Sequence, residues 1–232
     1  MPKPITDMTN AFSVKGLNVI VTGGNRGIGL GISTAFAQSG ANVAILCRNK
    51  ESGDRAAESL KEHGGKHFCV QCDTSSLESV KRAVAEVMMV FSGINVLVNN
   101  AGVSTVTKFH DDKDLSEWHR VVSTNLHGPA YMIYEVVPHM KKTGRGGSII
   151  NISSIAGITA LGRGNITHSM NKGGVNQLTR ELAVEWAKHN IRVNAILPCQ
   201  VLTEGFQRWL DSPEFDPALM NSFLSGIPMN RL

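Results

Sequence analysis

The sequence predicts a doubly wound α/β fold, in which a parallel sheet is flanked by helices on both faces. Along the 232 residues, short apolar segments alternate with longer segments of helical periodicity. The short segments are apolar throughout rather than at every second position, which is typical of strands buried on both faces. No internal repeat or linker divides the chain. We therefore expect residues 1–232 to form a single domain with right-handed crossovers.

The expected elements follow one another in a β–α rhythm. In the first half, strands are predicted over residues 18–22, 43–46, 68–71 and 96–98, and helices over residues 27–38, 51–63 and 76–91. Ser39 and Gly40 end the first helix, and Ser75 or Ser76 is a suitable N-cap for the third. The second half contains two helices within residues 115–142, a strand over 148–152, a helix over 167–188 and a strand over 191–196.

The segment over residues 202–232 differs in character from the rest. Its aromatic residues, among them Phe206, Trp209 and Phe223, lie among Ser, Asp and Pro residues. Either they close the hydrophobic core, or they form a mobile apolar lid over a pocket at the carboxyl ends of the strands. We expect residues 202–232 to form a substrate lid.

The composition excludes several classes of protein. Apolar residues make up 42% of the chain and charged residues 18%, which excludes disordered and fibrous proteins. No apolar run approaches the roughly 18 residues of a membrane helix, and residues 1–12 lack the apolar region of a secretory signal. We therefore expect a cytoplasmic protein that does not enter a membrane. Because the 23 basic residues are scattered, the net charge of +4 predicts no nucleic-acid partner.

The cysteines and histidines do not predict a metal site. Cys69 and Cys72 have C-x-x-C spacing, but no second pair of Cys or His residues lies at zinc-site distance. Both lie in an apolar, strand-like stretch, which favours reduced, packed thiols. The histidines show no ligand spacing with carboxylates or cysteines, so no metal is expected.

A glycine-rich turn follows the first predicted strand. Residues 22–29 read TGGNRGIG, and the helix over residues 27–38 begins within this turn. Glycines allow close approach of the backbone to a pyrophosphate, whose charge faces the helix N-terminus. The turn therefore predicts a Rossmann-like dinucleotide site, with the candidate binding residues Gly23, Asn25, Arg26, Gly27, Ile28 and Gly29.

The spacing G-x-x-x-G-x-G of this turn resembles that of the short-chain dehydrogenase/reductase family. Further segments match motifs of that family in the same order. They are Asp73-Thr74 after the third strand, Asn99-Asn100-Ala101-Gly102 after the fourth, Asn125 in TNLHG, Ser154 in NISSIAG, Lys172 in HSMNKGG, and Pro198 to Thr203.

The resemblance implies an oxidoreductase that transfers a hydride between a dinucleotide and a small alcohol or carbonyl compound. It assigns catalysis to Asn125, Ser154, Lys172 and the residue at the tyrosine position of the family motif Tyr-x-x-x-Lys, which is His168 here. It also implies a homo-oligomer. Together with the glycine turn, it assigns cofactor binding to Asp73, Thr74, Asn100, Ala101, Gly102, His168, Lys172, Pro198, Val201 and Thr203.

Alternative roles remain open for several of these side chains. Asp73 and Asn100 could instead be hydrogen-bond fillers at strand ends. Ser154 could be a turn cap, and Asn125 could fill a helix kink. Chemistry favours the catalytic assignment of Ser154, because hydride transfer to a carbonyl needs a donor that holds the developing alkoxide.

Charge at the end of the second strand predicts the cofactor. In NAD-binding proteins of this fold, an acidic residue at that position binds the ribose hydroxyls. Here Cys47 holds the position and Arg48 follows it. A guanidinium suits a 2′-phosphate because it donates bidentate, charge-assisted hydrogen bonds, and Arg26 adds a second positive charge. Unless both arginines are merely solvated surface charges, NADP(H) is preferred over NAD(H).

The sequence departs from the family pattern in two places. His168 is shorter than tyrosine by roughly 2 Å, and Lys172 beside it favours the neutral imidazole, so we expect weakened proton transfer. The alternative is a catalytically weak or inactive dinucleotide-binding protein. For a structural protein that binds no nucleotide, the glycines and asparagines of these motifs would have to be explained as turn residues alone. The second departure is that residues 227–232 end the chain where family members usually continue through a helix and a strand. We therefore expect the C-terminal segment to be incomplete.

Overall fold

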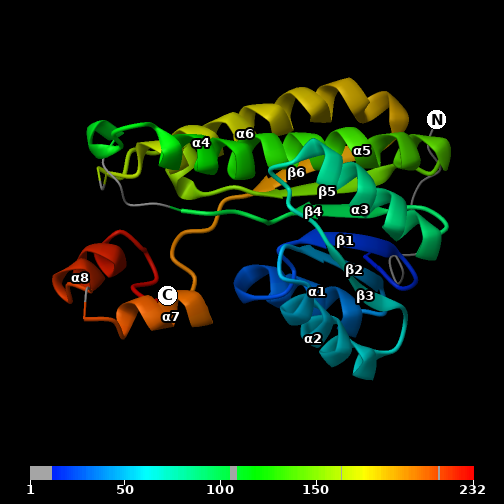
Figure 1. Ribbon diagram of the computed structural model, residues 1–232, viewed down its shortest axis with the longest axis horizontal. Helices are drawn as coiled ribbons and strands as arrows, with labels where there is room; N and C mark the ends of the chain where they lie inside the picture. The colour runs from blue at the N-terminus through cyan, green and yellow to red at the C-terminus, as the bar shows by residue number, and fades with distance from the viewer. Residues whose placement is uncertain (1–11, 105–108, 163, 214) are drawn as a thin grey trace.

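A six-stranded parallel sheet forms the centre of the computed structural model, which describes residues 12–104, 109–162, 164–213 and 215–232 (Figure 1). The strands lie in the order β3-β2-β1-β4-β5-β6, and every neighbouring pair is parallel. The order reverses between β1 and β4, which creates the switch point where such sheets bind ligands. The strands are β1 (Asn18–Thr22), β2 (Asn42–Cys47), β3 (His67–Gln71), β4 (Val96–Asn99), β5 (Gly147–Ile152) and β6 (Ile191–Ile196).

Helices cover both faces of the sheet. α1 (Gly27–Gln38) and α2 (Lys50–Leu60) pack on one face, and α3 (Leu77–Val90), α5 (Gly128–Lys142) and α6 (Ile166–Trp186) pack on the other (Figure 1). Each interface is a separate hydrophobic cluster, and β1 contributes Ile20 to one and Val21 to the other. The strands are apolar throughout because both of their faces are buried. The predicted doubly wound α/β fold is confirmed.

Shorter elements connect these layers and extend beyond them. α7 and α8 lie together at the lower left of the view (Figure 1). The shorter elements are η1 (Lys61–His63), η2 (Phe109–Asp111), α4 (Ser116–Val122), η3 (Ser123–His127), η4 (Ile155–Gly157), η5 (Ala187–His189), α7 (Glu204–Leu210) and α8 (Ala218–Ser225).

The expected helices differ from the structure in two places. The helix expected over residues 51–63 ends at Leu60 and continues as the 3₁₀ turn η1, because Gly64 and Gly65 adopt φ angles of 70° and 84°. The two helices expected within residues 115–142 form one continuous helical run, in which η3 is a π-helical turn. Such turns are frequent at functional sites, and this one carries Asn125.

None of the helices in the described ranges combines the length and the apolar composition that crossing a bilayer requires. Residues 1–11, which include most of the segment considered for a secretory signal, lie outside the described residues. Cys69 and Cys72 are buried and free, in agreement with the packed thiols expected from the sequence, and Cys47 is buried and free as well. The described residues contain no cluster of three or more groups able to hold a metal ion.

A chain of buried polar side chains fixes α6 to the sheet. Asn99 Nδ2 donates to Asn151 Oδ1, and Asn151 Nδ2 donates to Thr179 Oγ1, each at 2.9 Å. The side chain of Asn151 is fully buried, so these amides have no access to solvent. Because α6 carries His168 and Lys172, these hydrogen bonds fix where those two residues lie relative to β5.

We predict that Asn151→Ala lowers the free energy of unfolding by about 2–4 kcal/mol, because it leaves the Asn99 amide without its acceptor and opens a cavity. Urea denaturation followed by circular dichroism measures the change. Asn221→Ala, at an exposed position of α8, is the matched control and should change stability by less than about 0.5 kcal/mol. Equal effects of the two substitutions would contradict a stabilising role for the buried hydrogen bonds of Asn151.

Candidate functional site

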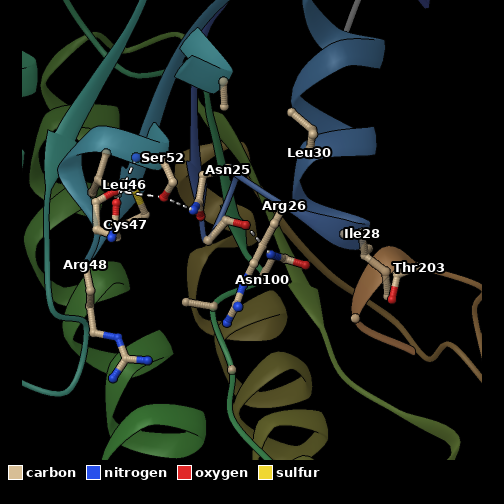
Figure 2. Close-up of a pocket in the computed structure, with 18 of the residues that line it drawn as sticks. Asn25, Arg26, Ile28, Leu30, Leu46, Cys47, Arg48, Ser52, Asn100 and Thr203 are labelled. Carbon is tan, nitrogen blue, oxygen red and sulfur yellow. Dashed lines mark hydrogen bonds between the residues drawn. The ribbon is translucent and has the colours of Figure 1, made fainter. Parts of the chain in front are cut away.

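A cleft of about 1090 Å³ lies at the carboxyl ends of β1 to β4. Its walls come from the turn after β1, the end of β2, the loops after β3 and β4, and the start of α7 (Figure 2). The volume is at the upper end of the range for small-molecule sites, as an extended dinucleotide requires. The structure thus brings most of the predicted cofactor-binding residues together. They are Gly23, Asn25, Arg26, Gly27, Ile28, Gly29, Arg48, Asp73, Thr74, Asn100, Ala101, Gly102 and Thr203.

The turn between β1 and α1 packs so closely against neighbouring atoms that Gly23 and Gly29 leave no room for a side chain. Gly23 has a φ angle of 63°, and a Cβ added there would lie 3.1 Å from Asn100 Nδ2 and Ala101 Cα. A Cβ added at Gly29 would overlap the Gly23 carbonyl oxygen. Glycine is therefore required for the turn itself to form, and it also leaves the backbone open toward the cleft.

The N-terminus of α1 faces this cleft without a side-chain cap. Arg26 holds the N-cap position and makes no capping hydrogen bond, and the first turn of α1 contains no acidic residue. The first amide groups of a helix lack partners within the helix, and they carry the positive end of its dipole. This end of the cleft therefore suits an anionic group.

Two cationic side chains lie near the end of β2. Arg26 and Arg48 are exposed, both line the cleft, and Figure 2 shows their guanidinium groups extending toward the same end of the view. Among the described residues, neither forms an ion pair within 4.0 Å. Cys47 is 7% exposed and holds the last position of β2. No carboxylate therefore occupies that position to repel an anion.

Asp73 and Asn100 have local partners as well as a place in the cleft wall. Asp73 Oδ1 accepts from the amide and the hydroxyl of Ser75, at 3.0 and 2.7 Å. Asn100 Nδ2 donates to Thr22 O at 2.9 Å and to Gly23 O at 3.2 Å. The Asn100 side chain thus has the strand-end role that the sequence left open, and it holds the glycine turn in place.

Asn125, Ser154, His168, Lys172, Pro198 and Val201 do not line this cleft. Asn125 nevertheless adjoins it, because its side chain forms two hydrogen bonds, of 2.8 and 2.7 Å, with the backbone of the cleft residue Val103. Pro198 O accepts from Ile155 N at 3.1 Å, which brings the loop after β6 against the turn after β5.

Ser154 and Lys172 are held against the end of β5. Ser154 Oγ accepts from Ala156 N at 3.1 Å and so caps η4, which is the capping role left open by the sequence. Lys172 is buried, and its Nζ donates to Ile152 O at 2.7 Å. Burial lowers the pKa of Lys172 to about 8, because the charged form loses hydration.

His168 lies one helical turn before Lys172 and is neutral at pH 7. Burial, and then the charge of Lys172, lower the pKa of His168 to about 4. Its Nδ1 atom is buried and has no hydrogen-bond partner among the residues that the structure describes. A polar atom buried without a partner is costly, and such atoms are often found where a ligand or water belongs.

Several residues of the cleft were not predicted from the sequence. For Ser52 a signal exists, because Asn49 precedes the start of α2 and its side chain accepts from Ser52 N at 2.8 Å, as an N-cap does. Asn25 Nδ2 then donates to Ser52 Oγ at 2.8 Å, which joins α2 to the glycine turn (Figure 2). Arg55 and Arg208 carry no local signal that distinguishes them from surface residues.

The arrangement matches known proteins over most of its length. The sequence profile described as short chain dehydrogenase matches residues 17–213. A tropinone reductase homologue from Arabidopsis thaliana is 35% identical over 222 residues, which cover 95% of this chain and 81% of that protein. The 3-oxoacyl-(acyl-carrier-protein) reductase FabG from Chlamydia pneumoniae is 38% identical over 224 residues, which cover 95% of this chain and 85% of that protein.

A solved structure is similar in fold to this chain as well. The Pseudomonas aeruginosa RhlG/NADP active-site complex aligns with a TM-score of 0.83 at 29% identity, covering 97% of this chain and 86% of that one. The chain therefore belongs to the short-chain dehydrogenase/reductase family of NAD(P)-dependent oxidoreductases.

Proposed function

We propose that this protein is an NADP(H)-dependent oxidoreductase that interconverts a small alcohol and its carbonyl compound. The observation that carries the proposal is the cleft at the switch point. It is lined by the glycine turn, by the uncapped N-terminus of α1 and by two arginines that form no ion pair with any described residue (Figure 2). When bound, the nicotinamide ring supplies or accepts the hydride. The preference for NADP(H) rests on Cys47 and Arg48 at the end of β2, and RhlG, named as an NADP complex, shows that relatives of this fold hold that cofactor.

The protein groups divide into those that hold the cofactor and those that serve the reacting oxygen. The amides of the glycine turn bind the diphosphate, Arg48 and Arg26 bind the 2′-phosphate, and Asp73 accepts from the adenine amino group. Further contacts come from the remaining candidates in the cleft wall and from the loop after β6. These are Thr74, Asn100, Ala101, Gly102, Pro198, Val201 and Thr203.

Ser154 and Lys172 retain donors for the substrate and the cofactor. The bond from Ala156 uses the Ser154 oxygen as an acceptor, so the hydroxyl proton remains available to a substrate oxygen. The bond to Ile152 uses one of three Lys172 protons, which leaves two for the nicotinamide ribose and the proton relay. Asn125 holds the loop after β4 and supports that relay.

His168 occupies the acid/base position in this proposal and weakens the enzyme. A neutral imidazole with a pKa of about 4 is a poor acid at pH 7, and its reach is shorter than that of a phenol. The alternative function, a catalytically weak or inactive dinucleotide-binding protein, shares the same cleft and differs only in turnover. The experiments below separate the two.

Residues 202–232 form the substrate lid in this proposal. Phe206, Trp209, Phe215 and Phe223 pack against one another, with ring centroids 4.9–6.2 Å apart. This aromatic cluster is separate from the two clusters that flank the sheet, which favours a lid over closure of the core. Thr203 and Arg208 connect it to the cleft.

The remaining features of the proposal follow the family. The substrate is a small molecule, and the names of the two relatives, a tropinone reductase homologue and a 3-oxoacyl reductase, both describe carbonyl reduction. We propose a homo-oligomer in the cytoplasm. Exposed apolar side chains on α5 and α6, such as Tyr134 (70% exposed) and Val184 (80% exposed), support association of copies.

We predict that Arg48→Ala weakens NADPH binding roughly 10- to 100-fold and leaves NADH binding unchanged, because it removes a charge-assisted contact to the 2′-phosphate only. Quenching of protein fluorescence by each nucleotide measures the dissociation constants. Arg82→Ala, on the exposed side of α3, is the control of equal charge. An equal loss for both nucleotides would contradict the assignment of Arg48 to the phosphate.

We predict that His168→Tyr raises kcat/KM for carbonyl reduction by about 10²-fold, because a phenol restores both the reach and the acidity of the proton donor. The NADPH dissociation constant should change little. A panel of ketones and aldehydes assayed with NADPH, with His189→Tyr at an exposed position as control, provides the measurement. If cofactor binds but neither protein turns over any carbonyl, the dinucleotide-binding alternative holds.

We predict that His168→Tyr reduces the loss of folding stability that occurs as the pH falls below 6.5. The pKa of His168 is lower in the folded protein (about 4) than in the unfolded chain (6.5), so the unfolded state binds the proton first as pH falls. Between pH 6.5 and 4 the folded state loses stability, by about 1–2 kcal/mol for this partly exposed group. Urea midpoints at pH 7 and pH 4.5 should differ less in His168→Tyr. Parallel profiles would contradict the burial of a neutral imidazole.

A further inference from the structure

Two buried thiols meet beneath the end of the cleft where β2 stops. The sulfur atoms of Cys47 and Cys69 lie 3.6 Å apart, and each residue is 7% exposed. Gly53 of α2 packs directly on them, because a Cβ added there would overlap both sulfur atoms. Neither thiol has a role in the cofactor contacts proposed above.

The two thiols differ in access and in acidity. Cys47 lines the cleft and Cys69 does not. The hydrogen bond from Cys69 is the main cause that lowers the pKa of Cys47, assisted by the charge of Lys50 and opposed by burial and by Asp54. The same hydrogen bond, together with burial, raises the pKa of Cys69. Cys47 is thus the thiol that a reagent reaches from the cleft, and Cys69 is a second thiol placed to react with it.

We propose that Cys47 and Cys69 form a reversible oxidation site that weakens dinucleotide binding when a disulfide joins them. The proposal rests on the function proposed above. The oxidant is a peroxide. The Cys47 thiolate attacks one peroxide oxygen and forms a sulfenic acid, and the O–O bond breaks to release hydroxide. Cys69 sulfur then displaces the sulfenic hydroxyl, its proton leaves with that group as water, and the S–S bond forms. Two thiols are oxidised, and one peroxide is reduced to two waters.

The position of the pair makes the bond strained and therefore easily reduced. In the β2–β3 register Cys69 pairs with Ile45, so Cys47 and Cys69 are diagonal rather than opposite neighbours. A disulfide brings the two sulfur atoms to about 2.05 Å, and strain in such a bond raises its reduction potential. In this proposal closure moves the strand ends, and a mild thiol reductant reverses the movement.

That movement reaches the cofactor contacts through neighbouring residues. Arg48 follows Cys47 directly, and Cys47 Sγ lies 3.2 Å from the Asn49 carbonyl oxygen. The Asn49 side chain accepts from Ser52, and the Ser52 hydroxyl accepts from Asn25 in the glycine turn. Closing the disulfide shifts Asn49, where this series of hydrogen bonds begins, together with the backbone of Arg48. We expect dinucleotide affinity to fall roughly five- to tenfold, as the loss of one or two hydrogen bonds produces.

The test uses the full chain with Cys199→Ser, which removes the exposed thiol and leaves the pair in place. Treatment with hydrogen peroxide should lower the intact mass by about 2 Da, and peptide mapping without reductant should join the Cys47 and Cys69 peptides. The NADPH dissociation constant should rise, and dithiothreitol should restore both the mass and the affinity. Bound NADPH should slow the oxidation, because the coupling is reciprocal.

Cys69→Ala is the matched variant, and its fold is checked by circular dichroism in reductant. Its Cys47 should stop at a sulfenic acid or a higher oxide, with no loss of 2 Da. A disulfide with other partners, no disulfide, or a Cys47–Cys69 disulfide with unchanged NADPH affinity would each overturn the proposal. Reduced protein that binds neither NADPH nor NADH overturns the proposed function instead, and the mass measurement still reports separately whether the thiols join.

Discussion

The site depends on a set of hydrogen bonds that joins the ends of β1 and β4. Thr22 Oγ1 accepts from the amides of Asn100 and Ala101, both at 3.0 Å, and Asn100 Nδ2 returns hydrogen bonds to Thr22 O and Gly23 O. At a switch point the two connecting segments leave the sheet in opposite directions, so their backbone groups lose strand partners. These side chains supply the missing partners. The crevice, the exposed start of α1 and the loop after β4 are all fixed by this one arrangement.

Side chains also hold backbone groups in place near the proposed reacting groups, as they do at the cleft. Asn125 holds Val103, and Lys172 holds the end of β5, in each case through backbone atoms. A framework that rests on backbone contacts tolerates changes in the side chains that face the substrate. The two relatives, which are 35% and 38% identical to this chain, differ in the substrates that their names give, as expected when one fold carries several functions.

The sequence predicted the fold well because burial on both faces leaves a simple signal in strands such as Val19–Val21. It was less informative where a structural role depends on distant partners. The bonds from Asn100 join residues 77 and 78 positions apart, so the strand order must be known before that role can be assigned. The contact of Cys47 with Cys69 likewise depends on the β2–β3 register. For His168, the sequence indicated a neutral imidazole beside Lys172, but the buried and unpartnered Nδ1 became evident only with α6 packed in place.

In the proposed function, Cys47 and His168 affect different free energies. The backbone amides and the helix N-terminus that attract the diphosphate do not involve either side chain, so they act whether or not the acid/base group is effective. In that proposal His168 acts mainly on the energy of the transition state, since proton transfer occurs there. Cys47 directly precedes Arg48, so in the same proposal it acts on the energy of the bound cofactor. A catalytically weak chain with an intact dinucleotide cleft is thus physically consistent, because the groups that bind and the groups that react are carried by separate parts of the sheet edge.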